Sequence, residues 1–218
     1  MIRLMFDGPS DAALGLVLAH GAGAGMDGDF MQMFARGLAE RGVRVARFEF
    51  AYMERRRHGR RSPPERMPKL RERYRAVFAQ LGPKPRWFIG GKSMGGRVAS
   101  MLADELGVPG VVCLGYPFHP PGAPERTRTE HLLALRTPCL IVQGTRDSFG
   151  TPEEVRRYQL PDSIRVCWIE DGDHSLVPRR SSGSTVAQAR TVALDATREF
   201  MHAVSVRRTR APQRKQSK

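Results

Sequence analysis

The chain is poor in cysteine, with three among 218 residues, and it contains no long apolar run. The three cysteines, Cys113, Cys139 and Cys167, fall within short apolar stretches that we expect to be buried strands. An odd number of cysteines is not typical of a disulfide-stapled secreted domain, so we expect reduced thiols and a cytoplasmic location. No stretch approaches the roughly 18 apolar residues of a membrane span, and the N-terminus lacks the apolar core of a signal peptide.

Lysine is also scarce, because only five of the 36 basic residues are Lys and the remainder are Arg. The formal charge of +14 is concentrated in two segments. Residues 53–73 hold nine Lys or Arg against three Glu, and residues 205–218 hold six without an acid. The second segment is typical of a disordered basic tail, so we place the folded domain at residues 1–204 and the tail at 205–218. Neither segment contains the aromatic residues that stack on single strands, so nucleic acid is not the partner we expect.

Apolar stretches of strand length alternate with longer helix-compatible segments along the whole chain. We expect strands near residues 2–6, 14–19, 43–48, 86–90, 110–115, 138–143 and 164–169. Helices are expected near 29–41, 66–81, 95–106, 127–135, 152–159 and 185–203. This alternation predicts an α/β fold with a mostly parallel central sheet and helices on both faces. The first two strands are expected to form an antiparallel hairpin around the turn Asp7–Asp11.

The most informative motif is Gly91-Lys-Ser93-Met-Gly95, which lies between a predicted strand and a predicted helix. This G-x-S-x-G pattern in that context is typical of a nucleophile elbow. The sharp turn exposes the serine hydroxyl, and glycines at the flanking positions avoid collisions with the neighbouring strand and helix. The pattern predicts Ser93 as a nucleophile and the Met94 N–H as one donor to a developing oxyanion.

Two further residues complete a possible catalytic set in the order serine, acid, histidine. Asp147 follows the predicted strand at 138–143, and His174 follows the one at 164–169. Strand ends in a parallel sheet share one edge, so both should lie near Ser93. Asp171 and Asp173 are competing candidates for the acid, but their place in a glycine-containing turn favours a local structural role. We therefore predict Asp147 as the acid and His174 as the base.

A glycine-rich loop, His20-Gly-Ala22-Gly23-Ala-Gly25, follows the strand predicted at 14–19. Such a loop can bring backbone N–H groups close to an oxyanion, and Ala22 or Gly23 is the expected second donor. A dinucleotide-binding turn is the alternative, but the G-x-G-x-x-G spacing is absent. No Cys or His spacing indicates zinc, so we expect neither a metal nor another cofactor.

These segments, together with Arg47–Met53, Gly115–Gly122 and Gly172–His174, resemble those of α/β-hydrolases. Within that superfamily the chain is most similar to small dienelactone-hydrolase-like members. It resembles in particular a largely uncharacterised bacterial group related to the hydrolase-like subunit of a chromatin acetyltransferase complex. The resemblance spans residues 14–203 and implies an α/β-hydrolase fold, a serine nucleophile at Ser93, an acid at Asp147 and a base at His174.

The expected function is hydrolysis of a small acyl substrate, either an ester or a thioester. The connection between Gly115 and Pro138 is too short for a lid domain, so we expect an open site with little or no lid. Lys92 could attract an anionic substrate, although a polar residue at this position needs no such role, and His131 is expected on a helix surface. The alternative is a catalytically silent scaffold whose basic segments contact nucleic acid or other anionic partners. The sequence does not determine the oligomeric state.

Overall fold

The computed structural model describes residues 1–210 and contains one seven-stranded sheet. Its strands are β1 (Leu4–Asp7), β2 (Leu14–Ala19), β3 (Val43–Phe48), β4 (Arg86–Lys92), β5 (Val111–Leu114), β6 (Cys139–Gly144) and β7 (Ile164–Ile169). Their order across the sheet is β1-β3-β2-β4-β5-β6-β7, and only β1 is antiparallel to its neighbour. The predicted mostly parallel sheet is therefore confirmed, with β4 at its centre.

The hairpin predicted for the first two strands is wrong. Strand β1 pairs with β3, with Leu4 opposite Phe48, while β2 is inserted between β3 and β4. Five of the six residues of β2 are buried, which fits a strand covered on both faces and hydrogen-bonded on both edges. Strand β1 is only partly buried and takes the edge of the sheet, and the segment between β1 and β2 is long enough to pass across β3.

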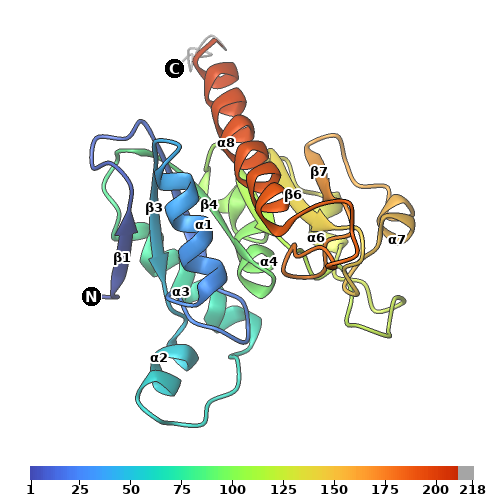
Figure 1. The fold of residues 1–218 in the computed structure, drawn as a ribbon. Helices are drawn as coiled ribbons and strands as arrows, with labels where there is room; N and C mark the ends of the chain where they lie inside the picture. Colours follow the sequence, from blue (N-terminus) through green and yellow to red (C-terminus); the bar gives the residue numbers. More distant parts are fainter. Residues whose placement is uncertain (211–218) are drawn as a thin grey trace.

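Helices cover both faces of the sheet (Figure 1). They are α1 (Asp29–Ala39), α2 (Ala51–Arg57), α3 (Met67–Ala79), α4 (Met94–Ser100), α5 (Ala103–Leu106), α6 (Glu130–Leu133), α7 (Pro152–Arg156) and α8 (Val186–Arg210). One apolar core joins α1 and α8 to the sheet through residues such as Phe34, Val45 and Met201. The other joins α3 and α4 to the opposite face through residues such as Tyr74, Ile89 and Val98. The two cores hold the central strands in a fixed position from both sides.

The helices differ from the expectation in three places, one of which is that the helix expected near 95–106 is divided into α4 and α5. The short helix α2 was not predicted, because four of its seven residues are charged and no apolar period marks it. Helix α8 continues through residues 205–210, into the segment for which the sequence predicts a basic disordered tail, and residues 211–218 of that segment lie outside the described residues. None of the helices in residues 1–210 has the length and apolar character needed to span a membrane.

The connection between β5 and β6 contains only the four-residue helix α6. As predicted, there is no lid domain in it. Helix α2 and the loop after it extend beyond the end of the sheet (Figure 1). The carboxyl ends of β4, β6 and β7 are followed by Ser93, Asp147 and His174, and these ends carry the candidate site.

Candidate active site

Ser93 lies between β4 and α4 with φ 50° and ψ −115°, a backbone conformation that side-chain-bearing residues rarely adopt. Two glycines make this sharp turn possible. A Cβ on Gly91 would lie 2.5 Å from the backbone carbon of Gly95, and a Cβ on Gly95 would lie 2.6 Å from the carbonyl oxygen of Ala19. Because these neighbours are backbone atoms that cannot move aside, the strand-to-helix turn requires glycine at both positions. The serine hydroxyl is thereby held at the end of the central strand.

Ser93, His174 and Asp147 form a continuous chain of hydrogen bonds. The Ser93 Oγ lies 2.9 Å from His174 Nε2, and His174 Nδ1 lies 2.8 Å from Asp147 Oδ2. Asp147 follows β6 and His174 follows β7, so the two neighbouring strand ends bring both side chains to the serine. An ionised aspartate only accepts hydrogen bonds, so Nδ1 carries the proton and Nε2 is free to accept the serine proton. This arrangement can activate a hydroxyl as a nucleophile.

The fully buried Asp147 carboxylate is held by two donors besides His174. Gln143 Nε2 donates to Oδ2 at 2.9 Å, and the Phe149 N–H donates to Oδ1 at 2.9 Å. These bonds compensate the loss of water around a buried charge and fix the carboxylate in the direction of the histidine. The Phe149 ring also lies 4.2 Å from the His174 ring, centroid to centroid. Neither Gln143 nor Phe149 was predicted from the sequence to hold the acid, although both lie within four residues of Asp147.

The two competing acids make different contacts. Asp171 pairs with Arg179 at 2.6 Å and with Arg146 at 2.8 Å, and the hydrogen bond from Arg179 lowers the pKa of its carboxyl to about 2. Asp173 Oδ1 accepts the backbone N–H groups of Ser175 and Val177. Both carboxylates therefore shape the loop that carries His174, while the ring itself bonds to Asp147.

The loop after β2 is fixed by two aromatic side chains. Buried His20 accepts the Phe50 N–H through Nε2 at 3.1 Å, so its Nδ1 carries the proton and donates to the Gly21 carbonyl at 2.6 Å. Burial lowers the pKa of His20, which agrees with this neutral form. The Tyr52 hydroxyl lies 3.1 Å from the carbonyl oxygens of both Gly21 and Ala22. Tyr52 was not identified from the sequence, because its helix α2 carries no recognisable pattern.

The predicted oxyanion donors lie at the edge of the same cleft. Met94 is the first residue of α4, so its N–H has no acceptor within the helix. Ala22 and Met94 line the cleft of about 430 Å³ that contains Ser93. Gly23 lies in the same loop as Ala22 but does not line the cleft, which favours Ala22 as the second donor. Within residues 1–210, no three His, Cys, Asp or Glu side chains are placed to hold a metal ion.

Lys92 does not line the cleft that contains Ser93. Its Nζ donates to the carbonyl oxygen of His174 at 2.5 Å and lies 5.4 Å from the centre of the Phe30 ring. The side chain is buried, and this burial lowers the pKa of the ammonium to about 8 against the opposing charges of Asp147 and Asp173. The lysine connects the elbow directly to the loop that carries the histidine. From the sequence, Lys92 could attract an anionic substrate, but in the structure its ammonium donates to the His174 carbonyl oxygen instead.

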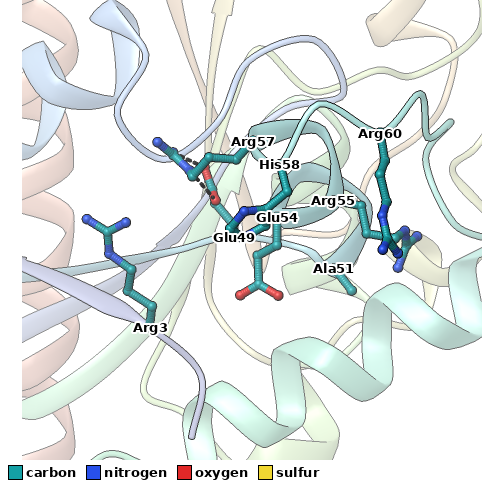
Figure 2. Close-up of a pocket in the computed structure, with 8 residues that line it drawn as sticks. All are labelled: Arg3, Glu49, Ala51, Glu54, Arg55, Arg57, His58 and Arg60. Atoms are coloured by element: carbon teal, nitrogen blue, oxygen red, sulfur yellow. Dashed lines mark hydrogen bonds and ion pairs between the residues drawn. The ribbon is translucent and has the colours of Figure 1, made fainter.

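A second hollow, of about 690 Å³, lies beside α2 (Figure 2). Its lining is mostly charged and includes Arg3, Glu49, Glu54, Arg57 and Arg60. Figure 2 shows the Arg57 guanidinium against the Glu49 carboxylate, a contact of 2.5 Å. Arg57 also pairs with Asp27, and Glu54 pairs with Arg73. Because most of these charges are already paired, the hollow lacks the reactive groups found at the end of β4.

A mostly parallel sheet with helices on both faces and a serine in a strained strand-to-helix turn defines the class of α/β-hydrolases. The family model for the alpha/beta hydrolase domain matches residues 12–202, and the chain belongs to this family.

Solved structures with the same fold include a dienelactone hydrolase from Anabaena variabilis, with 23% identity, a TM-score of 0.67 and coverage of 92% of this chain and 91% of that one. An α/β serine hydrolase without a lid from Xanthomonas campestris has 19% identity and a TM-score of 0.62, covering 96% of this chain and 90% of its own. The esterase domain of a Rhodothermus marinus protein has 18% identity and a TM-score of 0.63, covering 91% and 92%. At these identities the likeness concerns the fold.

Proposed function

We propose that the protein is a serine hydrolase that uses Ser93, His174 and Asp147 to cleave an ester or thioester of a small acyl substrate. The observation that carries the proposal is the unbroken hydrogen-bond chain from Ser93 Oγ through His174 to Asp147, with contacts of 2.9 and 2.8 Å. Ser93 lines an accessible cleft, and the buried Asp147 carboxylate accepts further hydrogen bonds from Gln143 and Phe149. A scaffold without activity would not need this combination.

In the proposed reaction, Ser93 Oγ attacks the substrate carbonyl while His174 Nε2 takes up the hydroxyl proton. The carboxylate of Asp147 stabilises the imidazolium that forms and keeps the ring in the correct orientation. The N–H groups of Met94 and of Ala22, or of Gly23 as the alternative, stabilise the negative oxygen of the tetrahedral intermediate. His174 then donates the proton to the leaving alcohol or thiol, and a water molecule deprotonated by the same ring releases the acid from the serine.

The substrate class rests on two supports. An open cleft without a lid domain admits small acyl groups directly from solvent, and the similar Rhodothermus marinus structure is described as an esterase domain. We also place the chain in the bacterial group related to the hydrolase-like subunit of a chromatin acetyltransferase complex, on the motifs around Ser93 and Asp147. The proposal includes no cofactor, because the three side chains supply nucleophile, base and orienting acid.

A panel of 4-nitrophenyl esters and matched thioesters with acyl chains from two to eight carbons tests this function. The wild-type protein should hydrolyse at least one series, and Ser93→Ala should lower kcat by about 10⁶, because the nucleophile is lost and only the surrounding site remains. Ser181→Ala is the matched control, since Ser181 is exposed and lies outside the cleft. Circular dichroism should show that both variants remain folded.

Equal activity of Ser93→Ala and wild type would contradict the proposal. A complete lack of turnover by the folded wild-type protein across both series would instead favour the silent scaffold.

A further inference from the structure

The cleft at Ser93 is lined by apolar side chains and by charged side chains. Met67, Leu70, Met94, Pro117 and Phe149 supply apolar surface, whereas Arg97, Arg128 and Glu65 bring charge to the same 430 Å³ space. An uncharged acyl substrate would need only the apolar side. The charged side therefore requires its own explanation.

Arg97 is the more closely placed of the two cations. It lies on α4 four residues after Ser93, so both residues are on the same face of the helix start. Its Nε is buried without a hydrogen-bond partner, and no acidic side chain among residues 1–210 pairs with its guanidinium. Arg97 is only partly buried and lines the cleft, so a molecule bound there can supply the missing counter-charge.

Arg128 lines the same cleft from the segment before α6. Burial and the charge of Arg97 both lower the pKa of its guanidinium, and again no acid of the described residues pairs with it. Glu65 lines the same cleft, but its Oε1 pairs with Arg55 at 2.8 Å and no ion pair joins it to Arg97 or Arg128. Its Oε2 is buried without a hydrogen-bond partner. Two like charges thus lie beside Ser93, and no acid of the described residues forms an ion pair with either of them.

We propose that the substrate carries an anionic oxygen group, a carboxylate or a phosphate, that binds between Arg97 and Arg128. The inference rests on the proposed function and defines its substrate class: an acyl compound with an apolar part against Met67, Leu70 and Phe149 and an anionic group against the arginines. Guanidinium groups offer paired N–H donors that match the two oxygens of such a group. Binding it would offset the repulsion between the two cations.

Two pairs of esters, each with an anionic and an uncharged member, test the proposal at pH 7.5. On the acyl side, 4-nitrophenyl hydrogen adipate is compared with 4-nitrophenyl hexanoate, and on the leaving side the butyrate of 4-hydroxybenzoate is compared with the butyrate of its methyl ester. The wild type should prefer the charged member of one pair, measured as the ratio of kcat/KM. Arg97→Gln and Arg128→Gln should each lower this ratio about tenfold to a hundredfold, the range of a hydrogen bond to a charged group.

Arg126→Gln is the matched control, because Arg126 is exposed in the same segment and does not line the cleft; the ratio should stay at the wild-type value. Both esters of a pair are measured on one preparation, so the ratio does not depend on the folded fraction of a variant. No preference in either pair, or a preference that survives both Arg97→Gln and Arg128→Gln, would overturn the proposal.

A separate measurement distinguishes failure of this inference from failure of the proposed function. Calorimetric titration of the wild-type protein with adipate and with inorganic phosphate reports anion binding without turnover and separates the two anion types. If no ester is cleaved but either anion binds in a manner that Arg97→Gln abolishes, the hydrolase assignment fails and the anion site stands. If neutral esters are cleaved while neither anion binds and no charge preference appears, the anion site fails and the hydrolase stands.

Discussion

The buried carboxylate of Asp147 shows how much a single residue depends on its neighbours. Three donors, the His174 ring, the Gln143 amide and the Phe149 N–H, replace the water that this carboxylate loses on folding. The Gln143 amide also donates to the Tyr116 carbonyl, and its oxygen accepts the Tyr116 N–H. The acid is thus fixed from strand β6 and from the segment after β5 at the same time.

Replacing this acid tests the assignment at the residue scale. Asp147→Asn should lower kcat by about 10⁴, the scale known for serine-protease triads, because an amide no longer selects the required histidine tautomer. Asp171→Asn is the comparison, and its kcat should fall by less than about tenfold, because Asp171 bonds to Arg179 and Arg146 and does not touch the ring. Steady-state kinetics on the best ester of the panel measures both. A larger loss in Asp171→Asn than in Asp147→Asn would show that the acid is misassigned.

The sequence predicts residues that belong to a recognisable motif or follow a predicted strand. It does not predict the role of residues that only contact and orient them. Ser93, Asp147 and His174 each follow a strand, so their order and position are visible in the chain. Gln143 and Lys92 look like ordinary polar residues near a strand end, and only the packed structure shows that one donates to the acid and the other to the His174 carbonyl. The place of Arg97 in the cleft is equally hard to predict, because no sequence pattern distinguishes a helix residue four positions after the serine.

At the scale of elements, strands are predicted better than their pairing. Each of β2 to β7 begins and ends within about two residues of its expected position, because buried parallel strands read as short apolar runs between polar turns. The partner of β1 was wrong because an exposed edge strand carries no information on which neighbour it joins. Helix α2 was missed because it is held by Tyr52 and by ion pairs, and not by an amphipathic face.

Helix α6 is connected to α4 by a hydrogen bond of His131, a residue that we expected on the surface from the sequence. His131 is half-buried, its Nε2 lies 2.9 Å from Ser100 Oγ, and the Ser100 hydroxyl donates to the Arg97 carbonyl. The ring therefore donates to Ser100 in its neutral form. Burial, with the charges of Arg97 and Arg71 opposing a proton, lowers the pKa of His131 to about 4. The surface prediction is wrong because the His131 ring packs between Ser100 of α4 and the Tyr116 ring.

This histidine should make stability depend on pH. Between pH 6.5 and about 4 the unfolded chain takes up a proton at His131 and the folded chain does not, so the free energy of unfolding falls as the pH falls. His131→Gln removes this contribution, and the wild type should lose about 2 kcal/mol more than the variant across the window, after discounting for partial exposure. Urea denaturation at pH 7, 5.5 and 4 measures the difference. Parallel pH profiles for the two proteins would refute the assignment.

For the whole molecule, ion pairs neutralise part of the basic segment 53–73 in the part that the structure describes. Within residues 53–73, Arg55, Arg57, Arg71 and Arg73 pair with glutamates. The exposed Arg60 and Arg61 have no ion pair with any of residues 1–210. With Lys69, which pairs with Glu72, five of the nine basic residues of this stretch are ion-paired, and an excess of positive charge remains. That nucleic acid is not a partner, that the protein is cytoplasmic and that residues 205–218 form a separate tail all stay predictions.

The central claim is that Ser93 is the reactive group of the whole molecule, and covalent labelling tests it most directly. The folded wild-type protein is treated with a fluorophosphonate, which reacts with activated serines, then digested and mapped by mass spectrometry. The geometry at the end of β4 predicts a single adduct on the peptide that contains Ser93, and no adduct in Ser93→Ala. An adduct on a different serine, or no adduct in a protein that is demonstrably folded, would contradict it.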